Sequence, residues 1–173
     1  MTVPARVDIQ LVYEELSQNM LLEKKQKINW LSMANDWIVM IDLVKKLIFP
    51  VHIFATTLRP DLIIYSNERK ILIILELTIP YESNVNSKHT YKFNKYSFLQ
   101  RELGADWTVF NHPWEVSARG YVSLSTQSML YKLGLCKKQM KSVMSQLSYC
   151  ALSSSFRIYL SRYHKTWVND STQ

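Results

Sequence analysis

Apolar residues recur at helical spacing near the start of the chain, which predicts an amphipathic helix over residues 8–25. These apolar positions are Ile9, Val12, Leu16 and Met20. A second helix is predicted to begin at Asn35 or Asp36, whose side chains suit an N-cap, and to run to about Lys46. Pro50 ends that stretch.

Three segments rich in Ile, Leu and Thr follow, and their composition predicts β-strands. They are His52–Thr56, Asp61–Tyr65 and Lys70–Ile79. The turn-like segment Ser66–Arg69 separates the last two. The run Ile71–Leu75 is apolar on both faces, which is typical of a central strand.

The second half of the chain returns mainly to helical patterns. After Pro80, a long basic helix is predicted to begin at Ser83 or Asn84 and to end at about Leu103. Trp107–Asn111 is predicted to form a further strand. The remainder, from about Val122, is predicted to form two helices that are broken near Gly134.

This order of elements predicts an α/β fold in which a mixed central β-sheet is flanked by helices. No repeat, low-complexity tract or linker divides the sequence. We therefore expect one domain over residues 1–173, with an N-terminal helical part at 1–35 and a core at 36–165.

The spacing of two acids around the predicted turn indicates a candidate site. Asp61 and Glu76 lie equally far from the midpoint between Glu68 and Arg69. In an antiparallel pair with a symmetric register, they would face each other with β-carbons about 4.5–5.5 Å apart. Two carboxylates at that distance repel unless a cation or a proton lies between them.

Glu76 also interrupts an apolar strand, where an unpaired carboxylate would be costly. A hard divalent cation such as Mg²⁺ would satisfy both acids and could activate a water for hydrolysis. Simpler interpretations stay open. Glu76 could be an edge residue that reaches solvent, or the partner of Arg59 or of a helix lysine. Asp61, after Pro60, could be a turn residue.

Composition and charge narrow the classes of function. Only 3 of the 173 residues are glycine, so neither a Walker loop nor a dinucleotide-binding loop can be built. The formal net charge of +7 favours polyanionic partners such as nucleic acid. The longest apolar run, Ile71–Leu75, is too short to cross a membrane.

The cysteines and histidines do not suggest a metal cluster. Cys136 and Cys150 are too few and too far apart, and the four histidines lack ligand spacing. Two cysteines without a secretory leader indicate a reducing, intracellular compartment. A chain that acts on DNA would be expected in the nucleus.

Several short motifs, in order, carry a resemblance to a known family. Arg59-Pro60-Asp61 followed by Glu76-Leu77-Thr78 resembles the PD-(D/E)XK, or restriction-endonuclease-like, nuclease superfamily. The chain is most similar to endonuclease-like domains associated with retroelements in animal genomes. The segments that carry the resemblance are residues 36–43, 57–62, 76–82, 92–96 and 118–122.

The resemblance implies a restriction-endonuclease-like fold and a catalytic metal, Mg²⁺ or Mn²⁺. Asp61 and Glu76 would be metal ligands, together with the backbone carbonyl of Leu77. The superfamily places a lysine two residues after the second acid, but Thr78 occupies that position here. This departure leaves the third catalytic role unassigned.

Basic residues beyond the motif could fill that role. Lys92 and Lys95 lie one turn apart on the predicted basic helix, and similar nucleases place a lysine on that helix. We favour Lys92, with Lys95 as its rival, although either could simply lie on a solvated face. Lys88, Lys92, Lys95 and Arg119 are the expected DNA-binding residues. Arg119 could clamp a phosphate or pair with Glu115.

The expected activity is hydrolysis of DNA phosphodiester bonds by a metal-activated water. The alternative is a DNA-binding or structural module of the same fold that has lost catalysis, as Thr78 suggests. A third, weaker interpretation is a protein-binding domain that uses the basic stretch Lys132–Lys141. Whether the substrate is duplex, branched or single-stranded, and whether the chain forms a homodimer, stays open.

Overall fold

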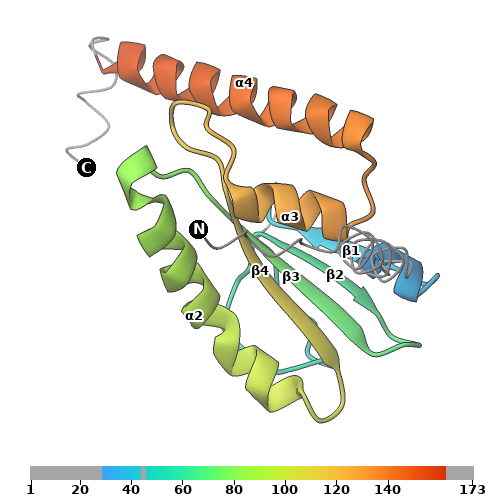
Figure 1. Ribbon diagram of the computed structural model, residues 1–173. Coiled ribbons are helices and arrows are strands. Elements are labelled where there is room, and N and C mark those ends of the chain that lie inside the picture. The colour runs from blue at the N-terminus through green and yellow to red at the C-terminus, as the bar shows by residue number, and fades with distance from the viewer. Residues whose placement is uncertain (1–28, 44–45, 163–173) are drawn as a thin grey trace, which may run out of the picture.

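The computed structural model describes residues 29–43 and 46–162, which form a four-stranded mixed β-sheet with helices packed against it (Figure 1). The strand order is β1 (Ile38–Ile41), β2 (Leu62–Ser66), β3 (Ile71–Thr78) and β4 (Thr108–Glu115). The first three strands are antiparallel, and β4 is parallel to β3. The predicted mixed α/β architecture is confirmed.

Three α-helices lie between residues 85 and 161 of the described chain. They are α2 (Val85–Leu103), α3 (Leu124–Lys132) and α4 (Lys137–Ser161). The predicted start of the basic helix is confirmed, because Asn84 is the N-cap of α2. The predicted break is also confirmed, since Gly134 adopts a φ of 97° between α3 and α4, which a residue with a side chain rarely adopts. The described residues also include two short 3-10 helices, η1 (Trp30–Met33) and η2 (Glu82–Asn84).

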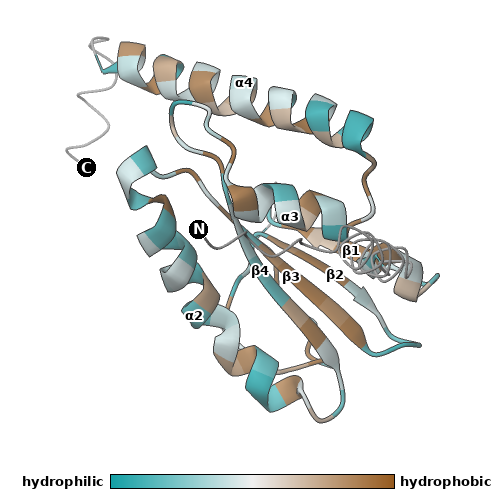
Figure 2. Cartoon of the chain, in the orientation of Figure 1, coloured by the Kyte–Doolittle hydropathy of each residue, from teal (hydrophilic) through white to brown (hydrophobic). Residues whose placement is uncertain are grey.

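The core lies on both faces of the sheet because consecutive residues of β3 point in opposite directions. Leu72 and Ile74 pack with Tyr96 and Leu99 of α2. The residues that alternate with them form a second cluster, which includes Met129 of α3 and side chains of α4. Apolar colouring is concentrated on β2 and β3, the interior strands (Figure 2). The prediction that residues 71–75 form a central strand is confirmed.

The predicted second helix is wrong, because the segment after Asp36 forms strand β1 instead. Ile38 pairs with Tyr65 at the edge of the sheet, so a tertiary contact outweighs the apparent cap. The Asp36 carboxylate accepts hydrogen bonds from the Ser66 hydroxyl and from the backbone N–H of Glu68. Asp36 therefore stabilises the β2–β3 turn and caps no helix.

The predicted strand at His52–Thr56 is also wrong. The backbone N–H groups of Ile53 and Phe54 both donate to the carbonyl of Pro50, which makes a turn. Strand β4, in contrast, extends beyond its predicted end at Asn111 and includes Pro113. A proline is tolerated there because β4 is an edge strand, where a missing N–H breaks no ladder on the open side.

Some predictions fall outside the described residues. The helix predicted over residues 8–25 lies there, as does the end of the predicted core after residue 162. Within the described part of the chain, no helix is long and apolar enough to cross a membrane.

Candidate active site

The register of the β2–β3 hairpin brings the two predicted acids together at its open end. Leu62 pairs with Leu75, so the next position outward places Asp61 opposite Glu76. The backbone N–H of Asp61 donates to Glu76 Oε2 at 3.1 Å, and the N–H of Leu77 donates to Asp61 Oδ2 at 2.9 Å. The predicted symmetric register is confirmed.

Glu76 is a buried carboxylate with two lysines on one oxygen. Its exposed fraction is 1%, and its Oε1 accepts hydrogen bonds from Lys92 Nζ at 2.5 Å and from Lys95 Nζ at 3.2 Å. Both candidate lysines therefore reach the same acid. The interpretation of Glu76 as the partner of a helix lysine is confirmed, whereas an edge position is excluded. Arg59 pairs with Asp42 at 3.5 Å.

Helix α2 brings the lysines to the acids because its inner face changes character along its length. The C-terminal half of that face is apolar and packs on the sheet through Leu99 and Leu103. One to two turns earlier, Lys92 and Lys95 reach the acidic end of β3. The C-terminal half of α2 is thus anchored in the core, and the middle of the helix holds two cations over a buried carboxylate.

Tyr96 was not expected at the site from the sequence. Its hydroxyl donates to the backbone carbonyl of Arg59 at 2.8 Å, which ties α2 to the segment that carries Asp61. Burial, and then the negative charge of Glu76, raise the pKa of Tyr96, so the hydroxyl stays a donor. Tyr96 follows Lys92 by four residues on the predicted helix, and this spacing could have predicted that both side chains lie on the same face.

The electrostatics of the acid pair favour a proton or a cation at Asp61. Burial is the main cause that raises the pKa of Asp61, and the neighbouring charge of Glu76 raises it further. The Leu77 N–H and the two lysines act in the opposite direction but do not cancel the increase. The ionised pair is thus incompletely compensated in the protein alone.

The acid pair offers only two carboxylates to a divalent cation. No group of three or more His, Cys, Asp and Glu side chains that could hold a metal ion occurs within residues 29–43 and 46–162. A cation at the acid pair would have Asp61, Glu76 and the Leu77 carbonyl as its protein ligands, as the sequence predicts, and would need water to complete its shell. Mg²⁺ commonly binds through one or two carboxylates and keeps several waters.

The other expected DNA-binding residues, Lys88 and Arg119, make no ion pair with Asp61 or Glu76. Lys88 is exposed on α2. Arg119 donates to Glu82 at 3.1 Å and lies over the ring of Tyr81. The expected alternative partner, Glu115, is buried elsewhere, so that pairing is wrong.

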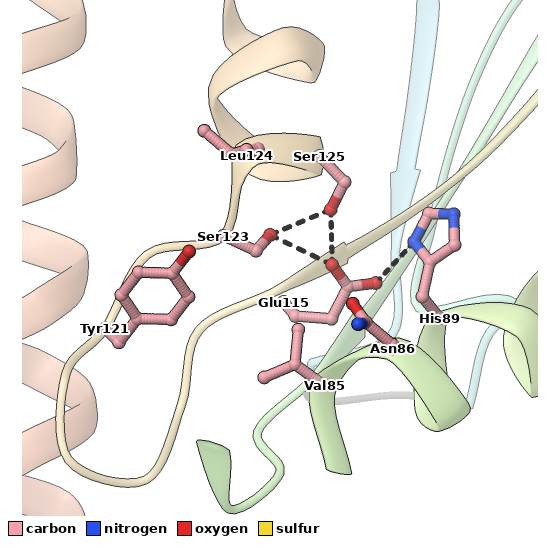
Figure 3. A pocket seen from close by; sticks show the side chains of 8 residues that line it. All are labelled: Val85, Asn86, His89, Glu115, Tyr121, Ser123, Leu124 and Ser125. Atoms are coloured by element: carbon pink, nitrogen blue, oxygen red, sulfur yellow. Dashed lines mark hydrogen bonds and ion pairs between the residues drawn. The ribbon is translucent and has the colours of Figure 1, made fainter. Parts of the chain in front are cut away.

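A second polar cluster adjoins the acid pair and was missed in the sequence. Glu115, at the end of β4, accepts hydrogen bonds from Ser123 and Ser125, and its other oxygen lies 2.8 Å from His89 Nδ1 (Figure 3). These residues line a pocket of about 210 Å³. The available signal was His89, which lies three residues before Lys92 on α2.

No protein-family model matches the chain, and no curated protein matches its sequence significantly. The class is therefore defined by the fold and the site alone. It is a mixed α/β protein with a paired-acid, paired-lysine cluster at the open end of a central hairpin.

Proposed function

We propose that this chain is a metal-dependent nuclease of the PD-(D/E)XK type that hydrolyses DNA phosphodiester bonds. The observation that carries the proposal is the buried Glu76, which faces Asp61 and receives both Lys92 and Lys95 on one oxygen. A buried carboxylate that faces a second acid is costly, and two lysines on one of its oxygens suit a site where negative charge develops during a reaction.

In this proposal Asp61, Glu76 and the Leu77 carbonyl hold Mg²⁺ or Mn²⁺. The chemistry that such an ion supplies when bound is a nucleophilic water at neutral pH and stabilisation of charge on a phosphoryl oxygen. Lys92 and Lys95 provide the positive charge that the motif pattern places at Thr78. They orient the attacking water and offset the negative charge that develops on the phosphate.

The exposed face of α2 supports DNA as the polyanion. Lys88, Tyr91 and Phe98 are exposed on α2, and Lys95 continues the same helical spacing but is half-buried against Glu76. Lysines gain affinity by releasing counterions from phosphates, and aromatic rings stack on unpaired bases. The face therefore suits DNA with accessible bases at least as well as a regular duplex. We expect the protein to act in the nucleus.

A specific observation also favours the alternative of an inactive module. Lys92 and Lys95 already compensate Glu76 without a metal, so this cluster could serve structure alone. Such a module would bind DNA with a steep salt dependence and would show no turnover.

The deciding experiment is cleavage of supercoiled plasmid and of duplex, branched and single-stranded oligonucleotides with Mg²⁺, Mn²⁺ or EDTA. Asp61→Ala is the test variant, and Asp106→Ala, which removes an exposed aspartate in a turn, is the matched control. Metal-dependent cutting that Asp61→Ala abolishes and Asp106→Ala retains would support the nuclease. Equal cutting by all three proteins would refute the site. No cutting by the wild type would favour the module.

A further inference from the structure

Glu115 is a buried carboxylate at the end of β4, where it lies between α2 and the start of α3. Its exposed fraction is 1%, and three side chains contact its two oxygens (Figure 3). His89 comes from α2, whereas Ser123 and Ser125 come from the start of α3. The backbone of Glu115 is fixed as well, because Thr126 Oγ1 bonds both its N–H and its carbonyl.

An apolar residue at position 115 would avoid the cost of burying a charge, so the carboxylate calls for another role. The contact between Glu115 and His89 suggests that this role is to orient the His89 ring. A carboxylate only accepts hydrogen bonds, so the Nδ1 of His89 carries the proton that lies toward Glu115. The other ring nitrogen, Nε2, points away from the carboxylate (Figure 3) and has no hydrogen-bond partner among the described residues. In acid–base catalysis, a buried carboxylate can orient an imidazole in this way for proton transfer.

This histidine lies beside the proposed catalytic centre. His89 and Lys92 are one turn apart on α2, and both contact acids of the sheet. Glu115 pairs in register with Thr78, two residues beyond Glu76 on the same face. The strand spacing and the rise per residue place the Cα atoms of Glu76 and Glu115 about 8 Å apart. A phosphodiester held at the acid pair would therefore have His89 as a neighbour.

We propose that His89, positioned by Glu115, is the general acid that protonates the leaving oxygen; this inference rests on the nuclease function proposed above. The oxygen of the attacking water forms a bond to phosphorus while the bond from phosphorus to the sugar oxygen breaks. His89 enters this step as the imidazolium, with one proton on each ring nitrogen. The sugar oxygen keeps that electron pair and takes the proton of Nε2, which leaves a neutral ring with its proton on Nδ1. The attacking water releases its proton to solvent, and His89 regains a proton from solvent while Nδ1 stays bonded to Glu115.

The test compares a substrate that needs a general acid with one that does not. The first is a DNA oligonucleotide, and the second is thymidine 5′-(4-nitrophenyl phosphate), whose nitrophenolate leaves without a proton. His89→Gln should lower the rate on DNA by about 10²- to 10⁴-fold and leave the rate on the ester unchanged. Glu115→Gln should show a smaller loss with the same selectivity. His52→Gln, in a histidine that bonds Asn67 on a distant turn, is the matched control.

Equal loss on both substrates in His89→Gln would overturn the inference, because it would indicate a structural role. Full activity on DNA would overturn it as well. A wild type that hydrolyses neither substrate would refute the nuclease itself, and the inference would fall with it. The imidazole ¹⁵N shifts of His89 in the wild type give a readout that needs neither a variant nor turnover. When the ring is neutral, its single proton must lie on Nδ1, and a neutral ring that carries this proton on Nε2 instead would contradict the proposed positioning by Glu115.

Discussion

Replacing Asp61 by Asn is expected to stabilise the metal-free protein at neutral pH. The change removes one of two facing carboxylates and keeps an oxygen that can accept the hydrogen bond from the Leu77 N–H. Two unit charges about 5 Å apart repel by about 3 kcal/mol at an effective dielectric constant of about 20. Attraction to Lys92 and Lys95 opposes part of this repulsion. We therefore expect a net gain of about 1 kcal/mol in the free energy of unfolding.

The pH dependence follows from the direction of the pKa shift. Burial and the charge of Glu76 raise the pKa of Asp61 in the folded state above its ordinary value of about 4. Between the two pKa values the folded protein binds more protons than the unfolded chain, so wild-type stability falls as the pH rises. The advantage of Asp61→Asn should be absent below the ordinary pKa and complete above the folded one.

Urea unfolding in EDTA over a pH series measures this difference, with Asp106→Asn as the control for a lost exposed charge. Addition of Mg²⁺ should stabilise the wild type more than Asp61→Asn, because only the wild type has both of the carboxylates that we propose as metal ligands. An Asp61→Asn protein that is less stable than the wild type at neutral pH in EDTA would refute the reasoning. It would show that the lysines more than compensate both acids.

Three further predictions concern the core, the lysines and the DNA-binding face. Leu72→Ala should lower the free energy of unfolding by about 2–5 kcal/mol, because Leu72 is fully buried under α2, whereas Leu43→Ala at an exposed position should have little effect in the same urea titration. Lys92→Ala and Lys95→Ala should each be tolerated. The double variant should lose more free energy of unfolding than the two single variants together, because only then does buried Glu76 lack a cation. Additive losses in the double-mutant cycle would contradict this. Lys88→Ala should lower the magnitude of the slope of log K against log salt for DNA binding by about 1, and an unchanged slope would remove Lys88 from the interface.

The hairpin and its acids could be predicted because the information is local. A short turn joins β2 to β3, so the register follows from counting outward from the turn to Asp61 and Glu76. The basic helix was equally accessible, because its capping residue and spacing lie within one segment. Local pattern therefore predicted the helix that carries both lysines, whereas their reach to the acid pair was expected from the family resemblance.

The errors arose where distant contacts decide the structure. The segment Ile38–Ile41 is a strand because β2 is available to pair with it, and the Asp36 side chain is committed to Ser66, 30 residues away. His89 and Glu115 are 26 residues apart and come from different elements. Their contact depends on how α2 packs against β4, and the spacing of apolar residues within either segment does not predict that packing.

The connection between β3 and β4 has a consequence for the folding pathway. The β2–β3 hairpin needs only a short loop closure, so it can form early and bring Asp61 opposite Glu76. The parallel pairing of β3 with β4 needs the whole of α2 as a crossover, and only its completion delivers the compensating lysines. An early hairpin would therefore carry two uncompensated negative charges. We expect the slow step in folding to be the one that docks α2 and relieves this repulsion.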